Sequence, residues 1–196
     1  MDTPLPLRKE ILSRRDRLTP GQIATMSARI EHILLDRQEI KTAKTVFIYV
    51  NFRSEVSTKE IINQLLCFGK QVAVPITRVT EKRLDIVTIS DPEADLVPGY
   101  CGIPEPREAL IKQRLIPPHD IDTIILPGSV FDKRCGRFGY GGGYYDRLLA
   151  KIPTAKRIAL AFELQIVDKL PLADHDEILD AVITEEQTIT NPSRSR

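Results

Sequence analysis

Three things are scarce in this 196-residue sequence: long hydrophobic runs, cysteine, and an excess of charge of either sign. The uninterrupted apolar runs are only a few residues long, so none could cross a bilayer as a helix. The opening residues, MDTPLPLRKE, also lack the apolar core of a signal peptide. We therefore expect a protein with no membrane partner.

The three cysteines, Cys67, Cys101 and Cys135, are far apart in the sequence and odd in number. They show no C-x-x-C spacing, which argues against both a zinc site and a disulfide framework. Free thiols are typical of a reducing compartment, so we expect a cytoplasmic protein. The 28 Lys and Arg residues are nearly balanced by 27 Asp and Glu residues. Because nucleic acid binding needs clustered positive charge, no nucleic acid partner is expected.

The hydrophobic pattern alternates between helical and strand-like segments. Two helices are expected in the first forty residues, and Thr19 followed by Pro20 and Gln22 is a typical start for the second of them. A similar capping box at residues 57–60 predicts another helix, which Gly69 ends. Short apolar and β-branched runs predict strands at residues 45–50, 71–76, 84–89, 122–126, 157–162 and 181–184.

Strands that alternate with helices predict an α/β fold with three layers, a mostly parallel sheet with helices on both faces. We expect a single domain over residues 1–190 and a disordered tail at residues 191–196. Residues 91–119 contain six prolines and few apolar runs, so they are expected to form a long connection. Ligands bind such sheets beyond the carboxyl ends of the strands, which favours the loops at residues 51–57 and 127–142.

The second of these loops carries a dense glycine cluster, GRFGYGGGYYDR, at residues 136–147. Glycine lets backbone N–H groups surround an anion, and the helix expected at residues 143–151 adds the positive end of its dipole. Arg137 and Arg147 add full charges, so the segment suits a polyphosphate. It lacks both the Gly-Lys-Ser/Thr of a P-loop and the spacing of a dinucleotide-binding loop. The alternative is a flexible loop that only joins a strand to a helix.

The longer segment PGSVFDKRCGRFGYGGGYYDRLLA, residues 127–150, resembles the signature of the 5-formyltetrahydrofolate cyclo-ligase family, also called methenyltetrahydrofolate synthetases. LRKEI near the start, YVNFRSEVST at 49–58, GIPEP at 102–106 and LPLADHDEILDAVIT at 170–184 also match that family in kind and order. The resemblance implies a monomeric ligase that uses ATP and Mg²⁺. Its substrate would be 5-formyltetrahydrofolate, with or without additional glutamates, and its products 5,10-methenyltetrahydrofolate, ADP and phosphate.

The resemblance also implies roles for individual residues. The ATP site is expected on the opening helix and the glycine cluster, at Arg8, Arg137, Phe138, Gly139, Tyr140, Gly141, Gly142, Gly143, Tyr144 and Tyr145. The folate site is expected at Val50, Glu55, Tyr140, Gly141, Gly142, Gly143 and Tyr144. Asp146 and Asp176 match magnesium positions, and Arg137 and Tyr144 are the candidate catalytic residues.

Simpler roles stay open for several of these residues. Arg8 alone would be a solvated helix charge, Glu55 an ordinary loop charge, and Asp146 a carboxylate that offsets a helix dipole. Two other functions also stay open from the residues alone. One is a sugar-phosphate isomerase or transferase that needs no ATP, and the other is a non-catalytic nucleotide- or folate-binding module.

The sequence departs from the family pattern at three positions. Phe138 stands where the family commonly has leucine, and Cys135 stands near a usual glycine. Pro4 replaces a lysine that would share a helix face with Arg8, four residues later. Lys9 points about 100° away from Arg8 on a helix, so we expect Arg8 to make its contact alone.

Overall fold

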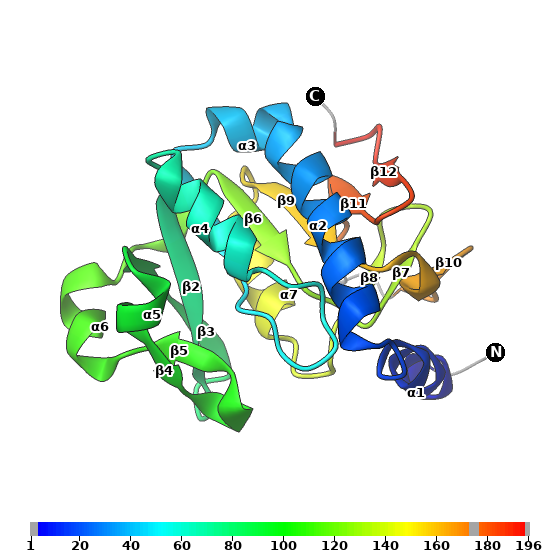
Figure 1. Ribbon diagram of the computed structural model, residues 1–196, viewed down its shortest axis with the longest axis horizontal. Helices are drawn as coiled ribbons and strands as arrows, with labels where there is room; N and C mark the ends of the chain where they lie inside the picture. Colours follow the sequence, from blue (N-terminus) through cyan, green and yellow to red (C-terminus); the bar gives the residue numbers. More distant parts are fainter. Residues whose placement is uncertain (1–3, 173–176, 195–196) are drawn as a thin grey trace.

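The computed structural model describes residues 4–172 and 177–194. Within these residues the chain forms an α/β unit around a seven-stranded sheet with the order β12-β11-β9-β6-β1-β2-β3 (Figure 1). The central strands from β11 to β2 pair in parallel, and the edge strands β12 and β3 are antiparallel to their neighbours. Helices cover both faces of the sheet, so the predicted three-layer, mostly parallel α/β fold is confirmed.

The elements are short for the most part. The main sheet consists of β1 (Thr45–Ile48), β2 (Gln71–Arg78), β3 (Arg83–Ile89), β6 (Thr123–Leu126), β9 (Lys156–Leu160), β11 (Ala181–Ile183) and β12 (Thr188–Thr190). Smaller sheets contain β4 (Leu96–Pro98) with β5 (Pro104–Pro106), and β10 (Ile166–Val167) with β7 (Val130–Asp132) and β8 (Arg137–Phe138). The helices are α1 (Pro4–Arg15), α2 (Pro20–Asp36), α3 (Gln38–Thr42), α4 (Lys59–Cys67), α5 (Pro92–Asp95), α6 (Glu108–Arg114) and α7 (Tyr144–Leu149). None of the helices in this described part of the chain is long and apolar enough to cross a membrane.

Successive residues of each central strand point to opposite faces of the sheet, and each face carries its own hydrophobic core. On one face Val46 of β1 belongs to the core that includes Ile30 of α2 and Ile61 of α4. On the other face Phe47 of β1 belongs to the core that includes Leu148 of α7. Burial on both faces explains why these strands are continuous apolar runs rather than alternating ones.

The helix starts were predicted with mixed success. At α2 the capping box is present, because the Gln22 N–H donates to Thr19 Oγ1 at 3.3 Å and the Thr19 N–H donates to Gln22 Oε1 at 2.9 Å. At α4 the predicted capping box is wrong. The helix begins after Thr58, whose hydroxyl accepts from the Asn51 N–H at 3.0 Å instead of capping the helix. Gly69 ends α4 as expected, with a φ of 71°.

Residues 91–119 do not form the long connection that their prolines predicted. They contain α5, β4, β5 and α6, which make an arm beside β2 and β3 (Figure 1). Arg114 Nη1 lies 2.6 Å from Asp95 Oδ2 within the arm, and the Thr77 N–H of β2 donates to Glu105 Oε1 at 2.8 Å. Prolines are tolerated in β4 and β5 because this two-stranded ribbon has edges whose backbone groups need no ladder partner.

Three shorter segments also differ from the prediction. The loop at residues 127–142 contains the hairpin of β7 and β8, and α7 is shorter than residues 143–151. The unpredicted strand β12 forms an antiparallel edge of the main sheet. The expected disordered tail is wrong for residues 191–194, which form a turn in which the Arg194 guanidinium lies 3.5 Å from the Asp180 carboxylate.

Candidate active site

The glycine loop (residues 136–143) lies beyond the carboxyl end of β6, where the strand rule places ligand sites. Ser129 holds the loop there. Its N–H donates to the Phe138 carbonyl oxygen at 2.8 Å, and its hydroxyl lies 2.9 Å from the same oxygen. Gly141 and Gly143 have φ values of 94° and 62°, in the left-handed region that glycine adopts without steric cost. The loop turns sharply at these residues to enter α7.

Arg137 and Asp146 form an ion pair at the base of the glycine loop. Arg137 Nη2 lies 2.5 Å from Asp146 Oδ1, and the two side chains are 2% and 30% exposed. The Arg137 guanidinium also donates to the Pro127 carbonyl at 3.3 Å and lies 5.7 Å from the centre of the Tyr145 ring. Asp146 stands in the first turn of α7, where the helix dipole favours a carboxylate. The structure therefore joins a residue predicted for phosphate to one predicted for metal.

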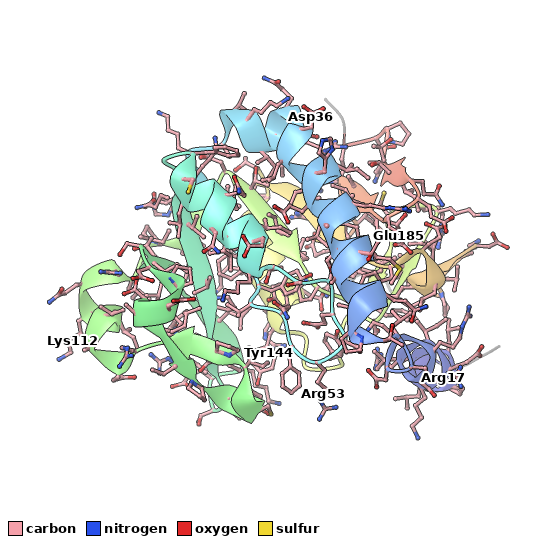
Figure 2. The ribbon with its side chains drawn as sticks, viewed as in Figure 1. Arg17, Asp36, Arg53, Lys112, Tyr144 and Glu185 are labelled. Atoms are coloured by element: carbon pink, nitrogen blue, oxygen red, sulfur yellow. The ribbon has the colours of Figure 1, made fainter. Side chains whose placement is uncertain are left out.

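Tyr144 and Arg147 border the glycine loop on its outer side. A methyl group built at Gly142 would lie 2.6 Å from the Tyr144 ring, so a larger residue does not fit there without a shift. Arg147 donates to the Gly142 carbonyl at 2.7 Å and to the Lys82 carbonyl at 2.6 Å, which ties the loop to the turn between β2 and β3. Figure 2 shows Tyr144 and Arg53 at the same edge of the molecule, both with outward side chains.

A cavity opens beside α7, just after the glycine loop. It has a volume of about 710 Å³ and is lined by Tyr144, by Leu84 of β3 and by Ile116 of the arm. Another cavity, of about 480 Å³, lies at the amino ends of the strands, beside Asp122 and Lys156. Since ligands of parallel sheets bind at the carboxyl ends, we assign the site to the end that holds the glycine loop.

Helix α1 brings Arg8 against the glycine loop. The Arg8 guanidinium lies 5.7 Å from the centre of the Phe138 ring, and a methyl group built at Gly141 would lie 3.5 Å from Arg8 Nη1. Lys9 is exposed on another side of the helix. The helix begins at Pro4, as expected for a proline at a helix start. Arg8 is therefore placed to meet an anion on the loop, and Lys9 is not.

The loop at residues 51–57 is closed at its base by a reciprocal contact. The Asn51 N–H donates to Thr58 Oγ1 at 3.0 Å, and the Thr58 N–H donates to Asn51 Oδ1 at 3.1 Å. Inside the loop Glu55 is 8% exposed, and its Oε2 accepts the Phe52 N–H at 2.8 Å. Val50, just before the loop, is half-buried against the core of the α2 and α4 face. The predicted folate residues Val50 and Glu55 thus lie just beyond the carboxyl end of β1.

The glycine loop and the 51–57 loop meet through Tyr140 and Glu55. The Tyr140 hydroxyl donates to Glu55 Oε1 and accepts a hydrogen bond from Arg15 Nη1 at 2.8 Å. Sequence reasoning missed Arg15, which is 4% exposed at the last position of α1. Its spacing of seven from Arg8 was the available signal, because residues two helical turns apart share a face.

Burial dominates the electrostatics of this junction. It raises the pKa of Glu55, although hydrogen bonds from Tyr140 and from the Phe52 N–H, and the charge of Arg15, oppose that shift. Burial likewise raises the pKa values of Tyr140 and Tyr145, so both hydroxyls stay protonated near neutral pH. A protonated Tyr140 can donate to Glu55, which matches the geometry.

Metal ligation has few candidates in the described part of the chain. There, no group of three or more His, Cys, Asp or Glu residues is arranged to hold a metal ion. Asp146 stands alone with its Arg137 partner, and Asp176 lies outside the described residues. Magnesium needs only one or two protein carboxylates when phosphate oxygens supply the other ligands. A lone, partly exposed Asp146 beside the glycine loop fits that requirement.

Known proteins resemble this chain over most of its length. The model of the 5-formyltetrahydrofolate cyclo-ligase family matches residues 4–185. The 5-formyltetrahydrofolate cyclo-ligase of Escherichia coli K12 is 31% identical over 176 residues, which are 89% of this chain and 96% of that protein. The mouse enzyme of the same name is 28% identical over 187 residues, 92% of each chain.

The solved structures agree with the sequence relatives. The NMR structure of Aquifex aeolicus 5,10-methenyltetrahydrofolate synthetase has a TM-score of 0.83 and 29% identity, and covers 95% of this chain and 92% of its own. A Mycoplasma pneumoniae structure with 22% identity and a TM-score of 0.73 supports the fold alone. With the family match spanning residues 4–185, this chain belongs to the 5-formyltetrahydrofolate cyclo-ligase family.

Proposed function

We propose that the chain carries out the reaction of its family where the glycine loop, α1 and the 51–57 loop meet. That reaction converts 5-formyltetrahydrofolate to 5,10-methenyltetrahydrofolate with ATP and Mg²⁺, and releases ADP and phosphate. The observation that carries the placement is the contact between Tyr140 and Glu55, which joins the loop predicted for ATP to the loop predicted for folate. Two substrates that exchange a phosphoryl group need adjacent sites.

The ATP phosphates are assigned to the glycine loop. Gly141 and Gly143 allow the backbone to curve around an anion, and Arg8 supplies a charge whose buried Nε has no hydrogen-bond partner among the described residues. Arg137, from beneath the loop, adds a second charge. The remaining residues of this assignment are Phe138, Gly139, Tyr140, Gly142, Tyr144 and Tyr145.

The folate is assigned to the other side of the same junction. The Glu55 carboxylate uses one site on each oxygen for Tyr140 and the Phe52 N–H, and its further lone pairs can accept N–H groups of the pterin. Val50 supplies an apolar wall. Tyr144 and the glycines at residues 141–143 would face both substrates.

Asp146 is the residue assigned to hold magnesium, together with phosphate oxygens of ATP. The ion, when bound, would neutralise charge on the phosphates during transfer. Asp146 would then hold the ion while it also pairs with Arg137. Asp176 is the second assigned ligand and comes from the segment outside the described residues.

The chemistry asks the protein for positioning and charge stabilisation rather than for a general base. The formyl oxygen on N5 attacks the terminal phosphorus of ATP, and ADP leaves. N10 then attacks the formyl carbon and gives up its proton, and the phosphate leaves with that proton to give the methenyl product. Arg8 and Arg137 would stabilise the charge on the transferred phosphoryl group, and Tyr144 would order the two reactants.

The extent of the domain, the oligomeric state and the glutamate chain of the folate can be tested separately. We propose a single domain over residues 1–190 that works as a monomer in the cytoplasm. The site would accept the folate with one or several glutamates. Elution at the monomer mass in size-exclusion chromatography checks the first of these statements, and a comparison of KM for mono- and polyglutamate substrates checks the second.

One coupled assay tests the function. Purified protein with ATP, Mg²⁺ and 5-formyltetrahydrofolate should produce the methenyl chromophore and phosphate in equal amounts. Omission of ATP or of Mg²⁺ should abolish both signals. Phosphate without chromophore, or turnover of a sugar phosphate in place of folate, would overturn the assignment. Thermal shifts with each ligand alone separate failed binding from failed chemistry, because stabilisation follows ligand concentration over Kd.

A further inference from the structure

Arg15 is a buried cation that the assigned substrate contacts do not use. It is 4% exposed, whereas arginine side chains are almost never fully buried without partners. Its Nε donates to Ser54 Oγ at 3.1 Å, and its Nη1 lies 2.8 Å from Tyr140 Oη and 3.4 Å from the Gly128 carbonyl oxygen. These partners come from the 51–57 loop, the glycine loop and the carboxyl end of β6. One side chain therefore bridges all the segments that converge on the site.

The hydrogen bonds around Arg15 have a fixed direction. Arg15 can only donate, so the Tyr140 hydroxyl accepts from it and gives its own proton to Glu55. Arg15 also lies 5.8 Å from the centre of the Tyr140 ring, which places the cation over the aromatic face. A buried cation, a hydroxyl and a buried carboxylate thus form one hydrogen-bonded chain, in which the hydroxyl links the two charges.

Tyr140 needs such a restraint. The residue is 49% exposed, so about half of it has no protein to pack against, although its hydroxyl is buried between Arg15 and Glu55. Its neighbour Gly141 has a positive φ and adds freedom to the loop. The hydroxyl contacts and the Arg15 cation hold this ring in position. Without Arg15, Glu55 would be the only partner left to the Tyr140 hydroxyl among the described residues, and Glu55 would lose a compensating charge.

We propose that Arg15 is a positioning residue of the cyclo-ligase reaction, which locks Tyr140 against Glu55 and so couples the folate loop to the ATP loop. This inference rests on the proposed function. Binding of either substrate would order the shared Tyr140–Glu55 contact and favour binding of the other. Arg15 itself touches neither substrate in this scheme.

A double-mutant cycle on Arg15 and Tyr140 tests the proposal. Arg15→Met keeps the length of the side chain without its charge, and Tyr140→Phe removes only the hydroxyl. Each single change should raise KM for 5-formyltetrahydrofolate about tenfold or more, the scale of losing a hydrogen bond to a charged group. The folate KM of the double variant should be no higher than that of the more impaired single variant, because both changes break the same Arg15–Tyr140 hydrogen bond. Arg14→Met, on the exposed side of α1, is the matched control and should leave both KM values unchanged.

The pH profile separates positioning from plain structural support. The charged and titratable groups around Glu55 are Arg15 of α1, Tyr49 beyond β1, and Tyr140 and Tyr145 of the glycine-loop side, and Asp16, just after α1, bonds to the neighbouring Ser54. Of these, only Arg15 contributes positive charge, so its removal favours protonated Glu55. The acid limb of kcat/KM for folate should then move to higher pH in Arg15→Met, and Arg15→Lys should restore it in part.

Two results would overturn the proposal while leaving the function intact. One is a wild-type protein that makes the methenyl product and an Arg15→Met variant with unchanged folate KM and acid limb. The other is a pair of single variants whose effects multiply in the double variant. If Arg15→Met does not fold, the test rests on Tyr140→Phe. An unchanged folate KM in that variant would show that the Tyr140 hydroxyl does not couple the two loops, and the proposal would be wrong. A wild-type protein without chromophore would instead refute the function itself.

Discussion

The pair of Arg137 and Asp146 is the most consequential contact at the scale of single residues. A charge as deeply buried as Arg137 is stable only when its partner is retained, so removing Asp146 entirely would leave an uncompensated cation. Any ligand of Asp146 must therefore tolerate or reorganise this pair. Asparagine keeps an oxygen for Arg137 and removes only the negative charge, which makes it the informative substitution.

Asp146→Asn should lower Mg²⁺-dependent turnover by about two orders of magnitude, the scale of losing one group that stabilises developing charge. The retained amide oxygen should keep the variant folded. The measurement is initial rate against Mg²⁺ concentration. Asp168→Asn is the control, because Asp168 is an exposed aspartate paired with Lys133 at 2.6 Å. An Asp146→Asn variant with the wild-type magnesium dependence would remove this residue from the metal site.

Arg8→Ala should raise KM for ATP strongly, because Arg8 is the α1 cation that lies against the glycine loop. The loss of a charge-assisted hydrogen bond corresponds to a change of roughly tenfold or more. Lys9→Ala should change little, since Lys9 is exposed on another side of the helix. Steady-state kinetics with ATP varied compares the two alanine variants side by side. A larger rise of the ATP KM in Lys9→Ala than in Arg8→Ala would show that Arg8 is not the residue of α1 that contacts ATP.

At the scale of elements, the site is made by loops that are tied at their bases. The Asn51 and Thr58 contact closes the 51–57 loop, and Thr58 is fully buried. A helix-capping role for Thr58 is lost as a result, and α4 starts without a side-chain cap. The Thr58 hydroxyl thus stabilises the shape of the 51–57 loop instead of the first turn of α4. The fixed loop in turn keeps Glu55 beside Tyr140.

Thr58→Val should lower the free energy of unfolding by about 1–3 kcal/mol, because the Asn51 N–H would lose its buried acceptor. It should also raise KM for 5-formyltetrahydrofolate, since the loop that carries Glu55 loosens. Thr19→Ala is the matched control: it removes the α2 cap and costs about 1 kcal/mol. It should leave KM unchanged. Denaturant unfolding and steady-state kinetics with folate varied should be measured on both variants. If Thr58→Val has the same folate KM as Thr19→Ala, the Asn51–Thr58 contact does not contribute to folate binding.

At the scale of the whole molecule, buried carboxylates set the response to acid. Burial acts to raise the pKa of Asp132, but hydrogen bonds from the Leu170 N–H and from Arg134 outweigh it and lower the pKa below its ordinary value. A carboxylate with a lowered folded-state pKa adds stability above its unfolded pKa and loses it as pH falls through the folded value. Asp132 accepts a hydrogen bond from the Leu170 N–H and so links the hairpin of β7 and β8 to that part of the chain. Protonation of Asp132 should therefore destabilise the end of the molecule that carries the glycine loop.

The melting temperature should therefore fall steeply below pH about 4, near the ordinary pKa of aspartate. Asp132→Asn should melt lower than wild type at pH 7, and its decline between pH 5 and pH 3 should be shallower. Thermal unfolding at a series of pH values measures both slopes. Parallel curves would mean that Asp132 does not contribute to the acid response.

The sequence by itself determined six strands of the main sheet, its layered and mostly parallel arrangement, and the two loops at the ligand end. Apolar runs such as residues 45–48 admit little other than buried strands, and parallel strands bring their carboxyl ends together. Arg8 and Glu55 were found by resemblance, with each residue treated alone.

Only the tertiary structure decided how these residues meet. Arg15 reads as one more charge on a basic helix, and its burial depends on segments 39 and 125 residues away. The same holds for Thr58, whose hydroxyl serves Asn51 rather than α4, and for residues 91–119, whose prolines hid an ordered arm. Local patterns report a residue's own backbone preferences and its helix face, whereas the partners in these contacts come from distant segments that no local pattern identifies.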